Sequence, residues 1–170
     1  MQITLPERIS GMAQIKIVTV GKLKEAYFSQ AQAEYIKRLR PYLKLDLWEV
    51  PDQPCPDGAS SVLEDQVRGK EGSAIRNLLQ PKDYIVALDR QGKEMSSPEL
   101  AAFLQDKIDR GVPLVFIIGG SLGLPEDLLR EAQLKWSFSR LTFPHQLFRV
   151  MLLEQIYRAC KINRGEPYHK

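Results

Sequence analysis

The sequence PLVFIIGGSLGLPED, residues 113–127, joins a short apolar run to a glycine-rich turn and then to a proline followed by two acids. A continuous apolar run that ends in glycine is typical of a strand buried on both faces, as in a parallel sheet. Proline suits the first turn of a helix, and Glu126 and Asp127 favour its positive N-terminal end. The stretch therefore predicts a strand, a tight turn and a short helix in succession.

Strands and helices are expected to alternate on both sides of this stretch. The expected strands are residues 14–20, 45–50, 83–89, 113–118 and a short one near 139–143. The expected helices are residues 24–39, one that follows Ser60 or Ser61 and runs through residues 67–79, 98–109, a short one after Pro125, and 146–162. Ser60 or Ser61 is the expected cap of the second helix and Ser97 of the third, and residues 90–97 are expected to form a turn. This order predicts an α/β fold with a mostly parallel sheet and helices on both faces.

Length and composition narrow the class of protein. The chain has 170 residues, of which 44% are hydrophobic and 26% charged. These fractions are close to the averages of soluble globular proteins and exclude disordered, collagen-like and coiled-coil proteins. Residues 1–11 lack clear periodicity and stand outside the fold argument, so residues 12–170 are expected to form a single domain. No signal peptide or run of eighteen apolar residues is present, which favours a cytoplasmic protein without a membrane segment. Cys55 and Cys160 have no Cys or His at metal spacing, so no metal site is expected.

Positive charge gathers at the end of the sequence. Residues 140–170 hold six Lys or Arg against two acids, an excess of four. Cations spread through an apolar segment suit a surface that contacts phosphates. The alternative is a solvated helix face, on which Glu154 and Arg158 form an i,i+4 pair.

Three loops are candidates for a binding site, because ligands of open parallel sheets bind at the carboxyl ends of strands. They follow Asp89, Ile118 and Phe143. The glycine turn lacks the Gly-Lys-Ser/Thr of a P-loop and the spacing of a dinucleotide fingerprint, which argues against a phosphate-gripping nucleotide enzyme. In residues 137–149, backbone groups suit the edge of a purine and apolar side chains suit its faces. His145 is interpreted as a helix-capping or core histidine.

Four segments together resemble one known family, that of ribosomal RNA large subunit methyltransferase H. They are KIVTVGKLKEAYFSQAQAEYIKRLRPY (16–42), LDRQGKEMSSPELA (88–101), FIIGGSLGL (116–124) and WSFSRLTFPHQLFRVMLLEQIYRACKINRGEPYHK (136–170). The resemblance covers residues 15–170, and the elements TFPHQ, EQIYRA and NRGEPYHK are its most specific parts. Residues 1–11 depart from the pattern, since members usually begin at the first strand.

The resemblance implies a SPOUT-class α/β fold with a C-terminal trefoil knot, acting as a homodimer. It implies transfer of a methyl group from S-adenosylmethionine to N3 of a pseudouridine in helix 69 of 23S rRNA, within assembled 70S ribosomes or 50S subunits. The apolar helix at 146–162 would pack in the knot and against the partner subunit. The alternatives are a ribosome-binding module of the same fold without activity, and the small nucleotide-binding enzyme considered above.

The resemblance also assigns residues to roles. The cofactor contacts would be Leu88, Gly119, Gly120, Phe138, Ser139, Arg140, Leu141, Thr142 and Phe143. The catalytic candidates are Arg149, Tyr168 and His169, with His169 as the base that removes the N3 proton. Arg158, Arg164 and Lys170 are expected to bind RNA.

Overall fold

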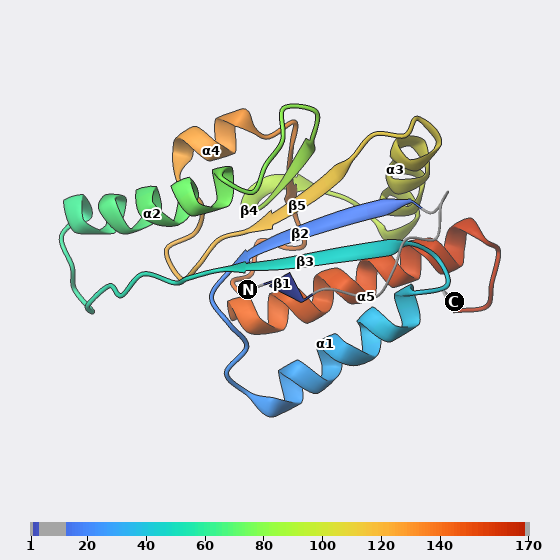
Figure 1. Cartoon of the computed structure of the whole chain (residues 1–170), viewed down its shortest axis with the longest axis horizontal. Coiled ribbons are helices and arrows are strands. Elements are labelled where there is room, and N and C mark those ends of the chain that lie inside the picture. The colour runs from blue at the N-terminus through green and yellow to red at the C-terminus, as the bar shows by residue number, and fades with distance from the viewer. Residues whose placement is uncertain (1, 4–12, 169–170) are drawn as a thin grey trace.

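The computed structural model describes residues 2–3 and 13–168 of the chain (Figure 1). The strands are β1 (Gln2–Ile3), β2 (Gln14–Val20), β3 (Lys44–Val50), β4 (Tyr84–Glu94), β5 (Leu114–Ile118) and β6 (Leu134–Ser137). The helices are α1 (Ala26–Leu39), α2 (Ser61–Arg76), α3 (Ser97–Asp109), α4 (Glu126–Glu131) and α5 (His145–Asn163). The predicted alternation of strands and helices is confirmed.

The described strands form one sheet in the order β1-β3-β2-β5-β4-β6. Strands β2 to β6 run parallel to their neighbours, and β1 lies antiparallel to β3 at the edge. Ile17 in β2 stands beside Leu47 in β3 and Phe116 in β5. Every residue of β5 is buried, which explains its uninterrupted apolar sequence. The prediction of a mostly parallel α/β sheet is confirmed.

Helices cover both faces of the sheet, as predicted. In Figure 1, α1 and α5 lie on one side of the strands, and α2 and α4 lie on the other. Ile17 belongs to the apolar cluster that includes Leu104 of α3 and Leu152 of α5. Its neighbour Val18 belongs to the opposite cluster, with Leu128 of α4. Successive residues of β2 thus serve two cores, because side chains alternate across a strand.

Strand β4 is longer than expected and continues through residues 90–94 of the predicted turn at 90–97. It pairs with β6 on both sides of a register shift that lies between Leu88 and Lys93, each of which stands opposite Trp136. Gly92 permits this path, because a Cβ there would lie 2.6 Å from the carbonyl carbon of Lys135. The strand therefore bends past β6 instead of turning away.

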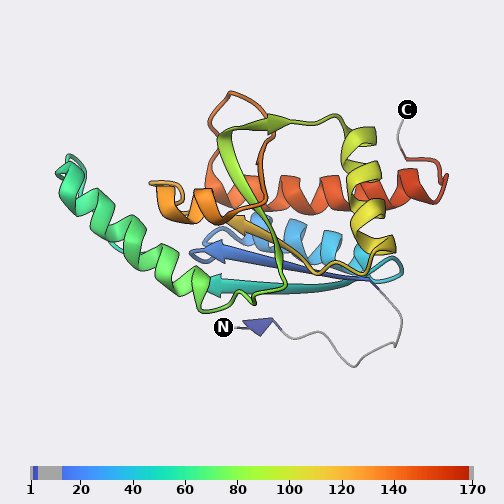
Figure 2. The same ribbon diagram turned by 90° about the horizontal axis from the view of Figure 1, so that it is seen from above.

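The third and second long helices begin at serines. Ser96, and not Ser97, caps α3, and its side chain and that of Glu99 form a reciprocal capping box. Ser60 caps α2 through an accepted bond from the Leu63 amide. Figure 2 shows the first turns of α2 extending past the strands.

The strand expected near 139–143 is absent from the described structure. The last strand, β6, ends at Ser137, and a loop follows it. The Ser137 hydroxyl donates to the carbonyl of Ser139 at 3.0 Å, and the Ser139 hydroxyl accepts from the Leu141 amide at 3.1 Å. These side-chain bonds to the backbone stabilise turns in place of a strand ladder.

Candidate functional site

A cavity of about 770 Å³ lies at the carboxyl ends of β5 and β6 and beside the middle of β4. Three segments far apart in the sequence line it: the part of β4 at its register shift, the glycine turn after β5, and the loop between β6 and α5. The lining residues are Leu88, Asp89, Arg90, Ile118, Gly119, Gly120, Ser121, Leu122, Gly123, Leu124, Ser137, Phe138, Ser139, Leu141, Thr142, Phe143, Pro144, His145 and Phe148. Its size falls within the range of about 300–1,000 Å³ that is typical of small-molecule pockets.

The glycine turn after β5 forms one wall of the cavity. A Cβ on Gly119 would lie 2.6 Å from the carbonyl carbon of Gly123, so the two backbone segments meet at a distance that only glycine allows. The turn closes with a 3.0 Å bond from the Gly123 amide to the Gly120 carbonyl, and Gly123 has a φ of 78°. Backbone polar groups therefore approach the cavity without intervening side chains.

Aromatic rings also line the cavity. Phe138 stacks on Phe148 with ring centroids 4.5 Å apart, and its other neighbour is the buried ring of Trp136. Phe143 lies 6.4 Å from Phe148 by centroids, and Leu141 is exposed at the rim. Apolar rings and backbone polar groups in one cavity suit a flat heterocycle whose edge carries hydrogen-bonding groups.

The structure brings together eight of the nine residues expected at the cofactor. They are Leu88, Gly119, Gly120, Phe138, Ser139, Leu141, Thr142 and Phe143. The ninth, Arg140, is exposed and is not among the lining residues. Their contact with a cofactor stays a prediction. The lining groups fit S-adenosylmethionine, since aromatic rings suit its purine and the glycine backbone suits its polar tail.

His145 also lines the cavity, which sequence reasoning did not anticipate. It is the first residue of α5 and is half-buried. Burial lowers the pKa of the imidazole, the nearby charges of Arg149 and Lys24 lower it further, and Asp52 opposes them. A neutral imidazole therefore faces the cavity at neutral pH. The signal in the sequence is its position two residues after Phe143, at the end of a candidate loop.

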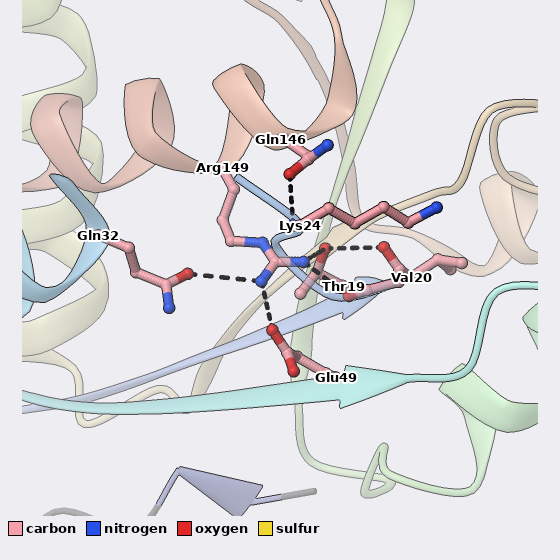
Figure 3. Close-up of polar contacts among 8 residues, drawn as sticks. Thr19, Val20, Lys24, Gln32, Glu49, Gln146 and Arg149 are labelled. Carbon is pink, nitrogen blue, oxygen red and sulfur yellow. Dashed lines mark hydrogen bonds and ion pairs between the residues drawn. The ribbon is translucent and has the colours of Figure 1, made fainter. Parts of the chain in front are cut away.

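Arg149 lies in the protein interior instead of the substrate pocket where it was expected (Figure 3). Its side chain is fully buried, and its guanidinium donates to Glu49 at 2.5 Å, to the Thr19 hydroxyl at 3.2 Å and to the Gly21 carbonyl at 2.8 Å. Gln32 of α1 is a more distant acceptor at 3.5 Å. Arg149 thus ties α5 to β2 and β3, and it supports the site without lining it.

Two of the three expected RNA-binding residues, Arg158 and Arg164, lie in the described chain, toward the other end of α5. Arg158 forms an i,i+4 ion pair with Glu154 and lies under the ring of Tyr168, 4.7 Å from its centroid. Arg164 is exposed, stacks over Tyr42 and donates to the carbonyl of Pro41 at 2.8 Å. The helix-face pair that was the alternative interpretation of the charge pattern is therefore present.

Tyr168 closes the described chain. Its hydroxyl donates to Glu154 at 3.2 Å, and burial raises its pKa to about 12, helped by Tyr35 and Glu154. The phenol is therefore protonated at neutral pH and suits a hydrogen-bond donor better than a base. The predicted roles of His169 and Lys170 fall outside the described residues.

A second cavity, of about 660 Å³, lies at the amino-terminal end of the parallel strands and holds none of the candidate residues. Lys16 and Lys82 both line it, and Lys16 is paired with Asp83 at 3.4 Å and donates to the Leu78 carbonyl. Within residues 13–168, no His, Cys, Asp and Glu side chains gather into a group that can hold a metal ion. No helix in the described part of the chain is long and apolar enough to cross a membrane.

Comparison with known proteins identifies the class. Residues 13–169 match the family model described as "Predicted SPOUT methyltransferase". Solved structures of a probable methylase from Haemophilus influenzae Rd KW20 (TM-score 0.53, 10% identity, 92% of this chain and 70% of that one) and a putative methylase from Neisseria gonorrhoeae (0.52, 12%, 98% and 91%) share the fold.

Closer relatives narrow the class to one family. Ribosomal RNA large subunit methyltransferase H of Desulfitobacterium hafniense strain Y51 is 48% identical over 160 residues, covering 94% of this chain and 100% of the relative. The protein of the same description from Carboxydothermus hydrogenoformans is 51% identical over 158 residues, covering 92% and 99%. The chain belongs to the ribosomal RNA large subunit methyltransferase H family of SPOUT methyltransferases.

Proposed function

We propose that this protein transfers a methyl group from S-adenosylmethionine to N3 of a pseudouridine in helix 69 of 23S rRNA. Its substrate would be the assembled 70S ribosome or 50S subunit in the cytoplasm. The observation that carries the proposal is that the glycine turn and the loop after β6 line one common cavity, in a chain of a ribosomal RNA methyltransferase family.

Different parts of the cavity lining would bind different parts of the cofactor. The loop of residues 138–143 would hold the adenine, with Phe138 and Phe143 on its faces and backbone groups on its edge. The glycine turn of residues 119–123 would then receive the methionine end. When bound, S-adenosylmethionine supplies a methyl group on a positively charged sulfur, and transfer leaves a neutral thioether.

The nucleotide must present a lone pair on N3, and that nitrogen carries a proton in the free base. His169 is the proposed acceptor of this proton, and nearby cations would stabilise the developing imide anion. Tyr168, which is protonated at neutral pH, would donate a hydrogen bond to the base or its phosphate. Orientation alone can supply up to about 7–11 kcal/mol of the acceleration.

The tail and the cavity of one chain are far apart, and this separation supports a homodimer. His145 begins α5 beside the cavity, and Tyr168 follows the other end of the helix. At about 1.5 Å per residue, the helix spans about 27 Å. We therefore propose that the tail of one subunit completes the site of the other. The knotted path of the C-terminal part is proposed on family membership alone.

Arg158, Arg164 and Lys170 would contact phosphates around the target nucleotide. Phosphate contacts position a protein on nucleic acid and make its binding depend on salt. Arg158 and Arg164 have internal partners in the free chain, so RNA would compete with Glu154 and with the Pro41 carbonyl.

The test is incubation of the protein with methyl-labelled S-adenosylmethionine and ribosomes that lack the modification. We expect label in 23S rRNA and one new reverse-transcription stop in helix 69, because N3 methylation blocks the pairing edge. The Gly119→Ala variant is the matched negative control. Absence of label from both 70S ribosomes and 50S subunits would contradict the proposal, and failure to bind S-adenosylmethionine in a calorimetric titration would favour a ribosome-binding module.

A further inference from the structure

Glu71 of α2 is a buried carboxylate that the proposed chemistry leaves without a role. The residue is only 4% exposed to solvent. One oxygen, Oε1, accepts a 2.9 Å hydrogen bond from the Gln53 amide. The other, Oε2, is buried and has no hydrogen-bond partner in the part of the chain that the structure describes. Buried polar atoms in native proteins are nearly always paired, so an orphaned carboxylate oxygen calls for an explanation.

The orphaned oxygen points at the glycine turn of the cofactor cavity. A Cβ built on Gly120 would lie 3.0 Å from Oε2, and Gly120 itself lines the cavity. Helix α2 also packs tightly on the segment that follows the glycine turn, since a Cβ on Gly72 would lie 2.5 Å from the side chain of Pro125. Gly120 therefore lies next to the carboxylate and also lines the cavity.

The surroundings leave the negative charge of Glu71 uncompensated. Burial raises the pKa of the carboxyl, and the charge of Asp52 raises it further, while the bond from Gln53 opposes both. Asp52 is itself acidic, so its negative charge repels that of Glu71 instead of balancing it. An isolated buried charge is costly unless a partner of opposite sign reaches it. A cationic ligand in the adjacent cavity is such a partner.

We propose that Glu71 is the counter-charge for the cationic end of the methyl donor and makes the site prefer the charged donor to its neutral product. The inference rests on the proposed function, in which the adenine lies in the loop of residues 138–143 and the methionine end lies at the glycine turn, and it adds that the sulfur lies toward Gly120. Donor and product differ there by one positive charge, because a sulfonium becomes a thioether. A carboxylate beside Gly120 can therefore retain the donor and help to release the product.

The test compares the two ligands in a single variant. Glu71→Gln keeps the shape and the acceptor for the Gln53 amide but removes the charge. Calorimetric titration should show about a tenfold loss of affinity for S-adenosylmethionine and at most about a twofold change for S-adenosylhomocysteine, as one nearby charge in a partly buried site implies. An analogue with an amine in place of the sulfonium should behave like the donor.

Glu64→Gln, the same change two turns earlier on α2, is the control and should alter neither affinity. The melting temperature of each variant without ligand checks that it is folded. Equal weakening of both ligands in Glu71→Gln would overturn the inference by assigning Glu71 a structural role, and unchanged affinities would overturn it too. If the wild-type protein binds neither ligand, the proposed function itself fails.

Discussion

The guanidinium of Arg149 and the carboxylate of Glu49 meet at 2.5 Å between α5 and β3, and the arginine is fully buried. The pair joins residues 100 positions apart in the sequence. It fixes the start of α5, and His145 in the first turn of that helix lines the cofactor cavity. The geometry of the cavity therefore depends on an ion pair beneath it.

Replacing Arg149 by Met should destabilise the protein strongly. The change leaves Glu49 without its cation and leaves the Gly21 carbonyl without its donor, and breaking a buried pair costs about 3–5 kcal/mol. Urea unfolding measures the loss. Arg110→Met removes an exposed i,i+4 pair with Asp106 and should cost far less, because exposed ion pairs contribute little to stability. A stable Arg149→Met protein would show that the pair is dispensable.

Adding a methyl group to Gly119 should abolish binding of S-adenosylmethionine. The new Cβ would collide with the backbone of Gly123 and Leu124, at 2.6 and 2.8 Å, and so would open the turn. Gly69→Ala is the matched control, because it faces open space on α2 and should stabilise the helix by up to about 1 kcal/mol. Calorimetric titration of both variants distinguishes the outcomes. Normal binding by Gly119→Ala would exclude the turn from the site.

Two inactive variants should complement each other if the tail acts across a dimer. One carries Gly119→Ala in the cavity, and the other carries Tyr168→Ala with His169→Ala in the tail. Random mixing would place one intact site in each mixed dimer and restore about a quarter of the wild-type rate. Label transfer to ribosomes measures it, with each variant alone as the control. Mixtures that stay inactive would indicate a tail that serves its own subunit.

The sheet and the cavity walls were predictable because their causes are local. Ile17 and Val18 alternate between two cores, and a strand pattern reports that alternation directly. The glycines of the turn are also a local signal, because they indicate a close approach of two backbone segments. Which loop follows which strand then locates the cavity, since carboxyl ends of parallel strands share one edge.

Contacts between residues far apart in the sequence could not be predicted from sequence patterns. Arg149 looks like any cation in an apolar helix until Glu49 and Thr19 are placed around it. Glu71 reads as one more polar residue of an amphipathic helix, and only the packing of α2 on the glycine turn buries it. The bonds of Ser137 and Ser139 that end β6 depend on a backbone path that strand propensity does not describe.

Removing the exposed cation of Arg164 should weaken ribosome binding and make it less sensitive to salt. Each phosphate contact contributes about one to the slope of log affinity against log salt, so Arg164→Ala should lower that slope by about one. Binding to 50S subunits at several salt concentrations measures the effect. Arg130→Ala, an exposed cation on α4, should leave the slope unchanged. An unchanged slope for Arg164→Ala would remove this residue from the RNA surface.

The stability of Glu71→Gln relative to the wild-type protein should increase with pH. The carboxyl of Glu71 has a raised pKa in the folded state and an ordinary one, 4.5, when unfolded. The folded state therefore holds the proton more tightly, and the stability that this adds at low pH is lost as pH rises through the folded pKa. Glutamine has no proton to lose, so the variant escapes this loss.

The measurement is urea unfolding of both proteins without ligand at pH 5 and at pH 8. The difference in free energy of unfolding, variant minus wild type, should be more positive at pH 8. Any constant effect of the buried amide cancels in this comparison. Asp52→Asn should show part of the same trend in the wild-type background, since Asp52 contributes to the raised pKa of Glu71. A difference that is the same at both pH values would mean that Glu71 keeps an ordinary pKa, with its charge already balanced in the free protein.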